Sequence, residues 1–107
     1  MKEGILAAVG GTPLVALRRL APDAPFRLFA KLEACNPGGS IKDRAALGLL
    51  EGAMRAGRIG SRTVVVESSS GNMGIGLAQA CAVLGLRFVC VVDARATSQN
   101  IAILRAY

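Results

Sequence analysis

Apolar and polar residues follow one another along the chain in a pattern that predicts strands followed by helices. Continuous β-branched runs favour strands, and apolar residues at helical spacing favour helices. The predicted strands span 14–17, 26–32, 63–66 and 88–92. The predicted helices lie between Ser40 and Gly57, over 73–84 and over 99–107. From residue 26 onward the order is β-α-β-α-β-α, which predicts an α/β fold with a parallel sheet and flanking helices.

Two of these elements are more apolar than a surface element needs to be. The strand at 63–66 is continuously apolar, as in a strand covered on both faces, and the helix at 73–84 carries little that is polar except Gln79. No helix stop signal follows the last helix, which runs to Tyr107. We therefore expect the N-terminal part of a longer protein. A complete small α/β domain is the alternative.

Composition narrows the class of protein. Hydrophobic residues make up 52% of the chain and aromatic residues only 4%, so we expect a core of aliphatic side chains. No apolar run reaches the roughly 20 residues of a membrane span, and the first residues make a poor signal peptide. The three cysteines lack metal-ligand spacing, and Cys81 and Cys90 lie in apolar runs that predict core positions. We expect a cytoplasmic protein with no membrane partner and no metal site.

The charge of the chain raises and then weakens the case for nucleic-acid binding. The formal net charge is +6 and the pI is near 10.1. The arginines are scattered, without a dense run or interleaved aromatic residues, so we expect no nucleic-acid partner. Small anionic ligands fit the charge equally well. The absence of histidine excludes histidine-based triads and imidazole acid–base chemistry.

A glycine-rich junction, 36–44, joins the predicted strand at 26–32 to the next helix. Ser40 and Asp43 have the form of a capping box, so the helix is expected to begin there. Lys42 falls in the first turn, where the helix dipole disfavours a cation. That position and partial burial would lower the pKa of Lys42, as a Schiff-base lysine requires. The alternative is a solvated lysine whose dipole clash is offset by Asp43.

A second strand–loop–helix junction, 68–72, carries three serines, a glycine and Asn72. In a parallel sheet it would lie at the same carboxyl edge as Lys42, where open α/β folds bind ligands. Hydroxyl groups and helix-start amides there suit a carboxylate or phosphate. The alternative is a hydroxyl-rich N-cap for the helix.

The same junction also permits a dinucleotide-binding interpretation. Gly71, Gly74 and Gly76 follow a strand and open a helix, and Asp93 ends the next strand. However, the glycine order is G-x-x-G-x-G, the reverse of the G-x-G-x-x-G fingerprint. An inactive fragment, or an anion- or dinucleotide-binding module, therefore remains the alternative from a different class of function.

Taken together, the motifs resemble those of the fold type II pyridoxal-phosphate enzymes of the cysteine synthase group. The matching stretches cover almost the whole chain in order, and they are GTPL (11–14), KLE (31–33), NPGGSIKDR (36–44), ESSSGNMGIGLA (67–78) and LRAY (104–107). Within that group the chain looks most like the 2,3-diaminopropionate biosynthesis branch. That narrower resemblance rests on CVVDARATSQNIAILRAY (90–107), because cysteine synthases usually carry a proline in place of Asp93.

The resemblance implies roles by position. Lys42 would form the Schiff base with pyridoxal 5'-phosphate and later move the substrate's α-proton. Asn72 would hydrogen-bond the ring hydroxyl of the cofactor. The substrate carboxylate would be held by Ser69, Ser70, Gly71 and Asn72. Met73 stands where cysteine synthases have threonine, which removes one expected hydroxyl contact.

The resemblance also implies an activity, a β-replacement on a serine derivative that joins phosphoserine to glutamate for siderophore precursors. A cysteine synthase that uses acetylserine or phosphoserine with sulfide is the alternative. Residues 1–107 would be the N-terminal part of the catalytic domain, in which 1–35 pack against the second half and 36–107 form a small βα subdomain. The phosphate loop of the family lies in that second half, so the 107 residues alone are expected to be inactive. The full-length protein is expected to be a homodimer with small amino-acid substrates.

Overall fold

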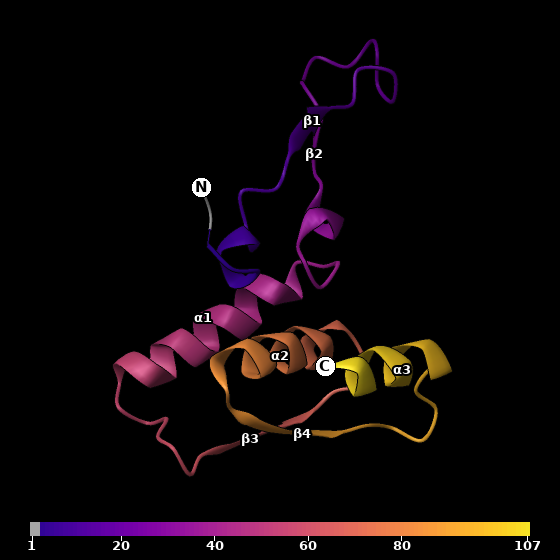
Figure 1. The fold of residues 1–107 in the computed structure, drawn as a ribbon. Helices are drawn as coiled ribbons and strands as arrows, with labels where there is room; N and C mark the ends of the chain where they lie inside the picture. Colours follow the sequence, from indigo (N-terminus) through magenta and orange to yellow (C-terminus); the bar gives the residue numbers. More distant parts are fainter. Residues whose placement is uncertain (1–2) are drawn as a thin grey trace.

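The computed structural model describes residues 3–107, which form two small sheets and three α-helices (Figure 1). Two short 3₁₀ helices, η1 (Leu6–Ala8) and η2 (Glu33–Cys35), flank the first two strands. The strands are β1 (Leu14–Ala16), β2 (Phe29–Lys31), β3 (Val64–Ser68) and β4 (Arg87–Val91). The α-helices are α1 (Lys42–Arg55), α2 (Asn72–Leu84) and α3 (Ser98–Ala106). None of the helices within 3–107 is long and apolar enough to cross a membrane.

Strands β3 and β4 form the parallel pair that the sequence predicts. They align from Val64 opposite Arg87 to Ser68 opposite Val91, with α2 as the crossover between them. Helix α2 covers one face of the pair and lies between it and α1 (Figure 1). Within residues 3–107 the opposite face is bare, and it presents four exposed valines, Val64, Val66, Val89 and Val91.

The strand expected at 26–32 does not lie in the parallel sheet, so that part of the prediction is wrong. Strand β2 does not join the parallel sheet; it pairs antiparallel with β1, with Val15 opposite Ala30. The two strands form a hairpin that projects away from the helices (Figure 1). A periodic apolar run predicts a strand but does not name its partner. An antiparallel partner can be reached through a simple loop, whereas a parallel one needs a long crossover.

Helices α1 and α2 hold the core. Its buried members are small or aliphatic, as the composition predicts: Ala46, Leu50, Leu77, Ala80 and Cys81. Helix α2 is buried from Gly74 to Cys81, which confirms its prediction as an interior helix. Its polar residue, Gln79, is also buried and donates a hydrogen bond to the Tyr107 hydroxyl at 3.1 Å. Burial raises the pKa of the Cys81 thiol, so this cysteine is a structural residue.

Candidate functional site

Helix α1 begins at Lys42, but the capping contacts differ from the predicted capping box. The Ser40 hydroxyl accepts a hydrogen bond from the Lys42 backbone N–H at 3.1 Å, not from that of Asp43. The buried Asp43 carboxylate accepts from the Gly38 N–H, and so it fastens the glycine-rich loop to the helix. The predicted start of the helix is confirmed. The hydrogen-bond partners expected for a capping box are wrong, because Ser40 binds the Lys42 N–H and Asp43 binds the Gly38 N–H.

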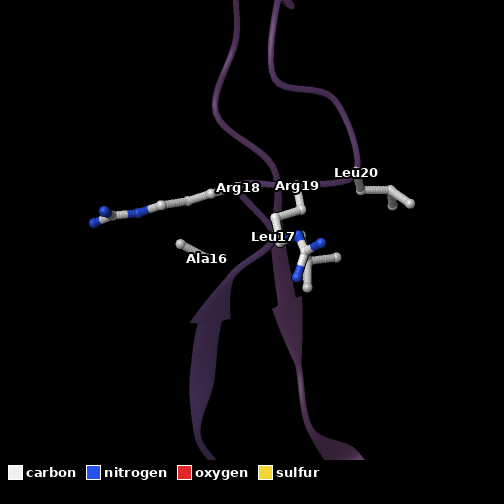
Figure 2. Close-up of a pocket in the computed structure, with 5 residues that line it drawn as sticks. All are labelled: Ala16, Leu17, Arg18, Arg19 and Leu20. Atoms are coloured by element: carbon white, nitrogen blue, oxygen red, sulfur yellow. The ribbon is translucent and has the colours of Figure 1, made fainter.

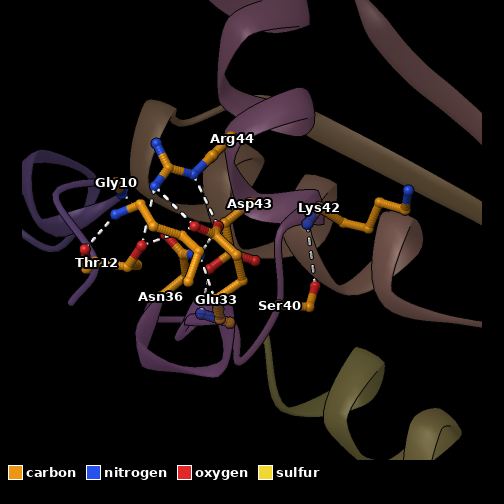
Figure 3. Close-up of polar contacts among 10 residues, drawn as sticks. Gly10, Thr12, Glu33, Asn36, Ser40, Lys42, Asp43 and Arg44 are labelled. Atoms are coloured by element: carbon orange, nitrogen blue, oxygen red, sulfur yellow. Dashed lines mark hydrogen bonds and ion pairs between the residues drawn. The ribbon is translucent and has the colours of Figure 1, made fainter. Parts of the chain in front are cut away.

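The Lys42 side chain is exposed and extends away from the polar cluster on the other side of the helix (Figure 3). Among residues 3–107 its ammonium group has no hydrogen-bond partner. The partial burial expected for Lys42 is therefore not found among residues 3–107. The glycine-rich loop packs against the Asp43 side chain and does not cover Lys42. The amine is left accessible to a ligand.

The close crossing of α1 and α2, and not a shared sheet edge, relates the position of Lys42 to that of Asn72. A Cβ atom on Gly76 would lie 3.3 Å from the Lys42 carbonyl oxygen, so α1 crosses α2 closely at this glycine. Asn72 precedes Gly76 by four residues and lies on the same face of α2, one turn closer to its N-terminus. Its side chain is exposed. The two residues thus lie in the first turns of two crossing helices, although Lys42 follows a strand that lies outside the β3–β4 sheet.

The serine hydroxyls of the second junction already have partners within the chain. The Ser69 hydroxyl accepts from the backbone N–H of Gly74 at 3.1 Å and of Gly71 at 3.3 Å, as an N-cap for α2 does. The Ser70 hydroxyl accepts from the Asp93 N–H at 2.7 Å. Ser69, Ser70, Gly71 and Asn72 therefore lie together at the start of α2. The N-cap residue is Gly71, and the Ser69 hydroxyl binds the first turn from two residues before it.

A polar pocket of about 270 Å³ lies beside Ser70. Asp93 and Arg95 line it and form an ion pair at 3.1 Å, which lowers the pKa of Asp93 from its usual value. Asn100 closes another side and donates to the Ser70 carbonyl oxygen at 2.9 Å. The pocket lies at the carboxyl ends of β3 and β4, the edge at which the sequence predicts ligand binding.

A second pocket, about 600 Å³, lies elsewhere, at the end of the β1–β2 hairpin. It is lined by the five residues from Ala16 to Leu20, and Arg18 extends away from Leu20 (Figure 2). None of its lining residues belongs to the predicted site, and they all come from the end of β1 and the loop that follows it. We therefore assign it no part in the chemistry of Lys42.

The glycines of the second junction have packing roles. A Cβ on Gly74 would lie 3.0 Å from the Cys90 sulfur, and one on Gly76 would lie 3.1 Å from the Ala46 Cβ. These glycines allow α2 to approach the strand β4 and the helix α1. Their presence is explained without a pyrophosphate, which removes the main support for the dinucleotide interpretation.

A cluster around Glu33 and Arg44 was missed in the sequence. Arg44 binds the Glu33 carboxylate with two nitrogens, at 2.8 and 3.0 Å, and its Nη2 also donates to the Thr12 hydroxyl at 3.1 Å (Figure 3). The Glu33 carboxylate also accepts a hydrogen bond from the Thr12 hydroxyl at 2.7 Å and one from the Asn36 side-chain amide at 2.8 Å. Arg44, and then Thr12, lower the pKa of Glu33 from its ordinary value of 4.5 to about 2. The sequence signal that could have identified this cluster is the presence of Thr12, Glu33 and Arg44 in three of the stretches that match the family.

Comparisons with known proteins agree with these motifs. The family described as "Pyridoxal-phosphate dependent enzyme" matches residues 5–107. The chain is 50% identical to the N-(2-amino-2-carboxyethyl)-L-glutamate synthase of Cupriavidus metallidurans, over 98% of this chain and 31% of that protein. It is 48% identical to the synthase of the same name from Ralstonia nicotianae, with the same shares covered. The chain thus spans about a third of the length of these curated relatives.

The similarity to solved structures agrees with the family match. The crystal structure of a cysteine synthase from Entamoeba histolytica matches 99% of this chain and 32% of its own, with a TM-score of 0.92 and 35% identity. The match includes the hairpin, so the departure of β2 from the parallel sheet belongs to this architecture. The predicted α/β class is confirmed, and the chain belongs to the family of pyridoxal-phosphate dependent enzymes.

Proposed function

We propose that these residues are the N-terminal part of an enzyme that performs a β-replacement, joining a phosphoserine-derived unit to the amine of glutamate. The product would be the N-(2-amino-2-carboxyethyl)-glutamate named in the two synthases, a precursor of 2,3-diaminopropionate for siderophores. The observation that carries the proposal is the 50% identity to such a synthase over nearly the whole chain. We further propose a cytoplasmic homodimer whose other partners are small amino acids.

The residues present fit pyridoxal 5'-phosphate. The Lys42 amine and the Asn72 amide are both exposed and make no hydrogen bond to other residues of 3–107. They belong to the first turns of α1 and α2, two helices that cross closely at Gly76. An amine for the aldehyde and an amide for the ring hydroxyl are the donor groups that this cofactor needs. Lys42 and Asn72 would therefore hold it, and once bound it would supply an electron sink for carbanion chemistry.

The start of α2 would bind the substrate carboxylate. Its backbone N–H groups and the positive end of its dipole favour an anion. Ser69 and Ser70 would act mainly by shaping this turn, because their hydroxyls already accept hydrogen bonds from the backbone. Asn72 would contribute a free side-chain amide. Lys42 would take up and return the α-proton at its Nζ atom.

We also propose a division of the chain into two packing units. Residues 36–107 would form the small βα subdomain, which has its own core between α1 and α2. Residues 1–35 would pack against the second half of the catalytic domain. The support for this is the exposure of Leu14, Phe26 and Phe29, whose side chains find little cover among residues 3–107.

The lysine is tested in the full-length protein by trapping. Borohydride reduction of the cofactor-loaded protein, followed by peptide mass spectrometry, is expected to find the cofactor attached to Lys42. In the Lys42→Ala variant the attachment and the visible absorbance of the lysine-bound cofactor are expected to disappear. Arg55→Ala, on the exposed last turn of the same helix, is the control and is expected to keep both. Attachment at another lysine would refute the assignment.

Sulfide is the competing nucleophile, because cysteine synthases share the fold of this chain. Phosphoserine or acetylserine is supplied with either glutamate or sulfide, and the product is identified by mass spectrometry. We expect the glutamate adduct to form from phosphoserine at a higher kcat/KM than cysteine does. A higher kcat/KM for cysteine formation would reassign the enzyme.

A further inference from the structure

Three consecutive residues at the start of α1 point in three directions because a helix turns about 100° per residue. Lys42 is exposed, Asp43 is buried beneath the loop at Gly38, and Arg44 reaches the carboxylate of Glu33 (Figure 3). Fixing the rotation of this turn through Arg44 therefore also fixes the direction in which Lys42 leaves the helix.

The Glu33 carboxylate is the hub of the contacts that fix this rotation. It accepts two hydrogen bonds from Arg44, one from Thr12 and one from Asn36. The bidentate geometry restricts both the position and the tilt of the guanidinium plane. The Glu33 side chain is 18% exposed and that of Arg44 39%, so the pair is partly shielded from water.

The segment that precedes β1 closes around the same pair. Gly10 donates its backbone N–H to the Asn36 side-chain oxygen at 2.8 Å and adopts a φ of 82°. A Cβ on Gly10 would lie 2.9 Å from a guanidinium nitrogen of Arg44, so the backbone itself packs against this side chain. The base of the hairpin and the first turn of α1 are thereby held as one unit.

We propose that Glu33 and Arg44 are positioning residues for the cofactor reaction of Lys42. This inference rests on the proposed function. Neither residue touches the reacting atoms; together they hold the first turn of α1 so that the Lys42 side chain leaves the helix in one fixed direction. Loss of the ion pair would let the turn rotate or fray, and small misplacements of a reacting group cost rate steeply.

The test measures the rate at which full-length apoprotein captures pyridoxal 5'-phosphate on Lys42, followed by visible absorbance and by borohydride trapping. Glu33→Gln keeps the shape of the side chain but removes its charge. Arg44→Lys keeps the charge but removes the two-pronged geometry. Glu51→Gln breaks the exposed pair with Arg55 farther along α1 and is the matched control. Melting temperatures of the apoproteins are recorded in parallel.

We expect capture on Lys42 to slow about 10- to 100-fold in Glu33→Gln and Arg44→Lys, and to stay at the wild-type rate in Glu51→Gln. We also expect the pH profile of the bound cofactor's absorbance to shift in the first two variants only. Wild-type capture rates and pH profiles in both variants, with only a lower melting temperature, would assign the pair a purely structural role. If Glu33→Gln does not fold, Arg44→Lys decides alone. Failure of the wild-type protein to capture cofactor on Lys42 would instead refute the proposed function.

Discussion

At the scale of single residues, Glu33 makes folding stability depend on acid pH. Its pKa is about 2 in the folded chain, against an ordinary value of 4.5, chiefly because Arg44 donates to it. A carboxylate with a lowered folded-state pKa stabilises the fold above its unfolded-state pKa. That contribution is lost as the pH falls through the folded-state value. The window for Glu33 therefore runs from about pH 4.5 down to about pH 2.

Thermal denaturation of Glu33→Gln at a series of pH values tests this. We expect the variant to melt below the wild type at pH 7 and the gap to narrow steadily below pH 4.5. Glu51→Gln, whose carboxylate lies in an exposed helix pair, is expected to show no such convergence. A gap that stays constant from pH 7 to pH 2.5 would mean that the Glu33 charge does not contribute.

The sequence singles out Lys42 and Asn72 as the proposed reactive residues but does not show the contacts that hold their helices. Lys42 and Asn72 stood out because each follows a distinctive loop and opens a helix, which are local signals. The Glu33–Arg44 pair joins residues 11 apart, and the Thr12–Arg44 contact joins residues 32 apart. Such contacts depend on how the hairpin folds back on α1, which no local pattern specifies. The burial expected for Lys42 was wrong for the same reason.

At the scale of elements, the crossing of α1 and α2 depends on the missing side chain of Gly76. A Cβ there would lie 3.1 Å from the Ala46 Cβ and 3.3 Å from the Lys42 carbonyl oxygen, and backbone cannot yield as a flexible side chain can. We expect Gly76→Ala to lower the free energy of unfolding by about 1–3 kcal/mol in urea denaturation. It would also move the start of α1.

Gly48 in α1 provides the matched control for Gly76→Ala. A Cβ added to this helical glycine meets no atom within 4 Å. Gly48→Ala is therefore expected to raise the free energy of unfolding by up to about 1 kcal/mol, as alanine favours a helix over glycine. If both substitutions stabilise the protein equally, the crossing is looser than these distances indicate.

Element types were predicted well, and their partners less well. Helix α2 and strands β3 and β4 are long apolar runs bounded by polar or glycine residues, and each lies within a residue or two of its expected place. Strand β2 also exists, but it is only three residues long and pairs with β1. The local sequence pattern determines whether a segment is a helix or a strand. The partner of a strand depends instead on the length of the connecting loops and on which apolar surfaces are still exposed.

At the scale of the whole molecule, the face of the β3–β4 pair that α2 does not cover exposes a row of valines. Val66 and Val91 are 62% and 55% exposed, and Val64 and Val89 extend the same face. Exposed apolar faces bind hydrophobic dyes and partner surfaces. We expect the 107-residue chain to bind an environment-sensitive dye, and Val66→Thr with Val91→Thr to lower the bound-dye fluorescence.

Val83 provides the control for this face. It is 52% exposed but lies on α2, away from the four valines. Val83→Thr is expected to leave the bound-dye fluorescence near the wild-type value. An equal loss in this variant would show that the dye reports general apolar exposure and not binding to the β3–β4 face.

The three directions taken by Lys42, Asp43 and Arg44 constrain how the length of this region can change. One residue inserted into the first turn of α1 would rotate the side chains that precede it by about 100° relative to those that follow. An insertion between Lys42 and Arg44 would separate the amine that we propose as reactive from the residue that we propose orients it. Length variation is therefore best tolerated in the irregular loop at 17–28, beyond the base of the hairpin, where neither residue is displaced.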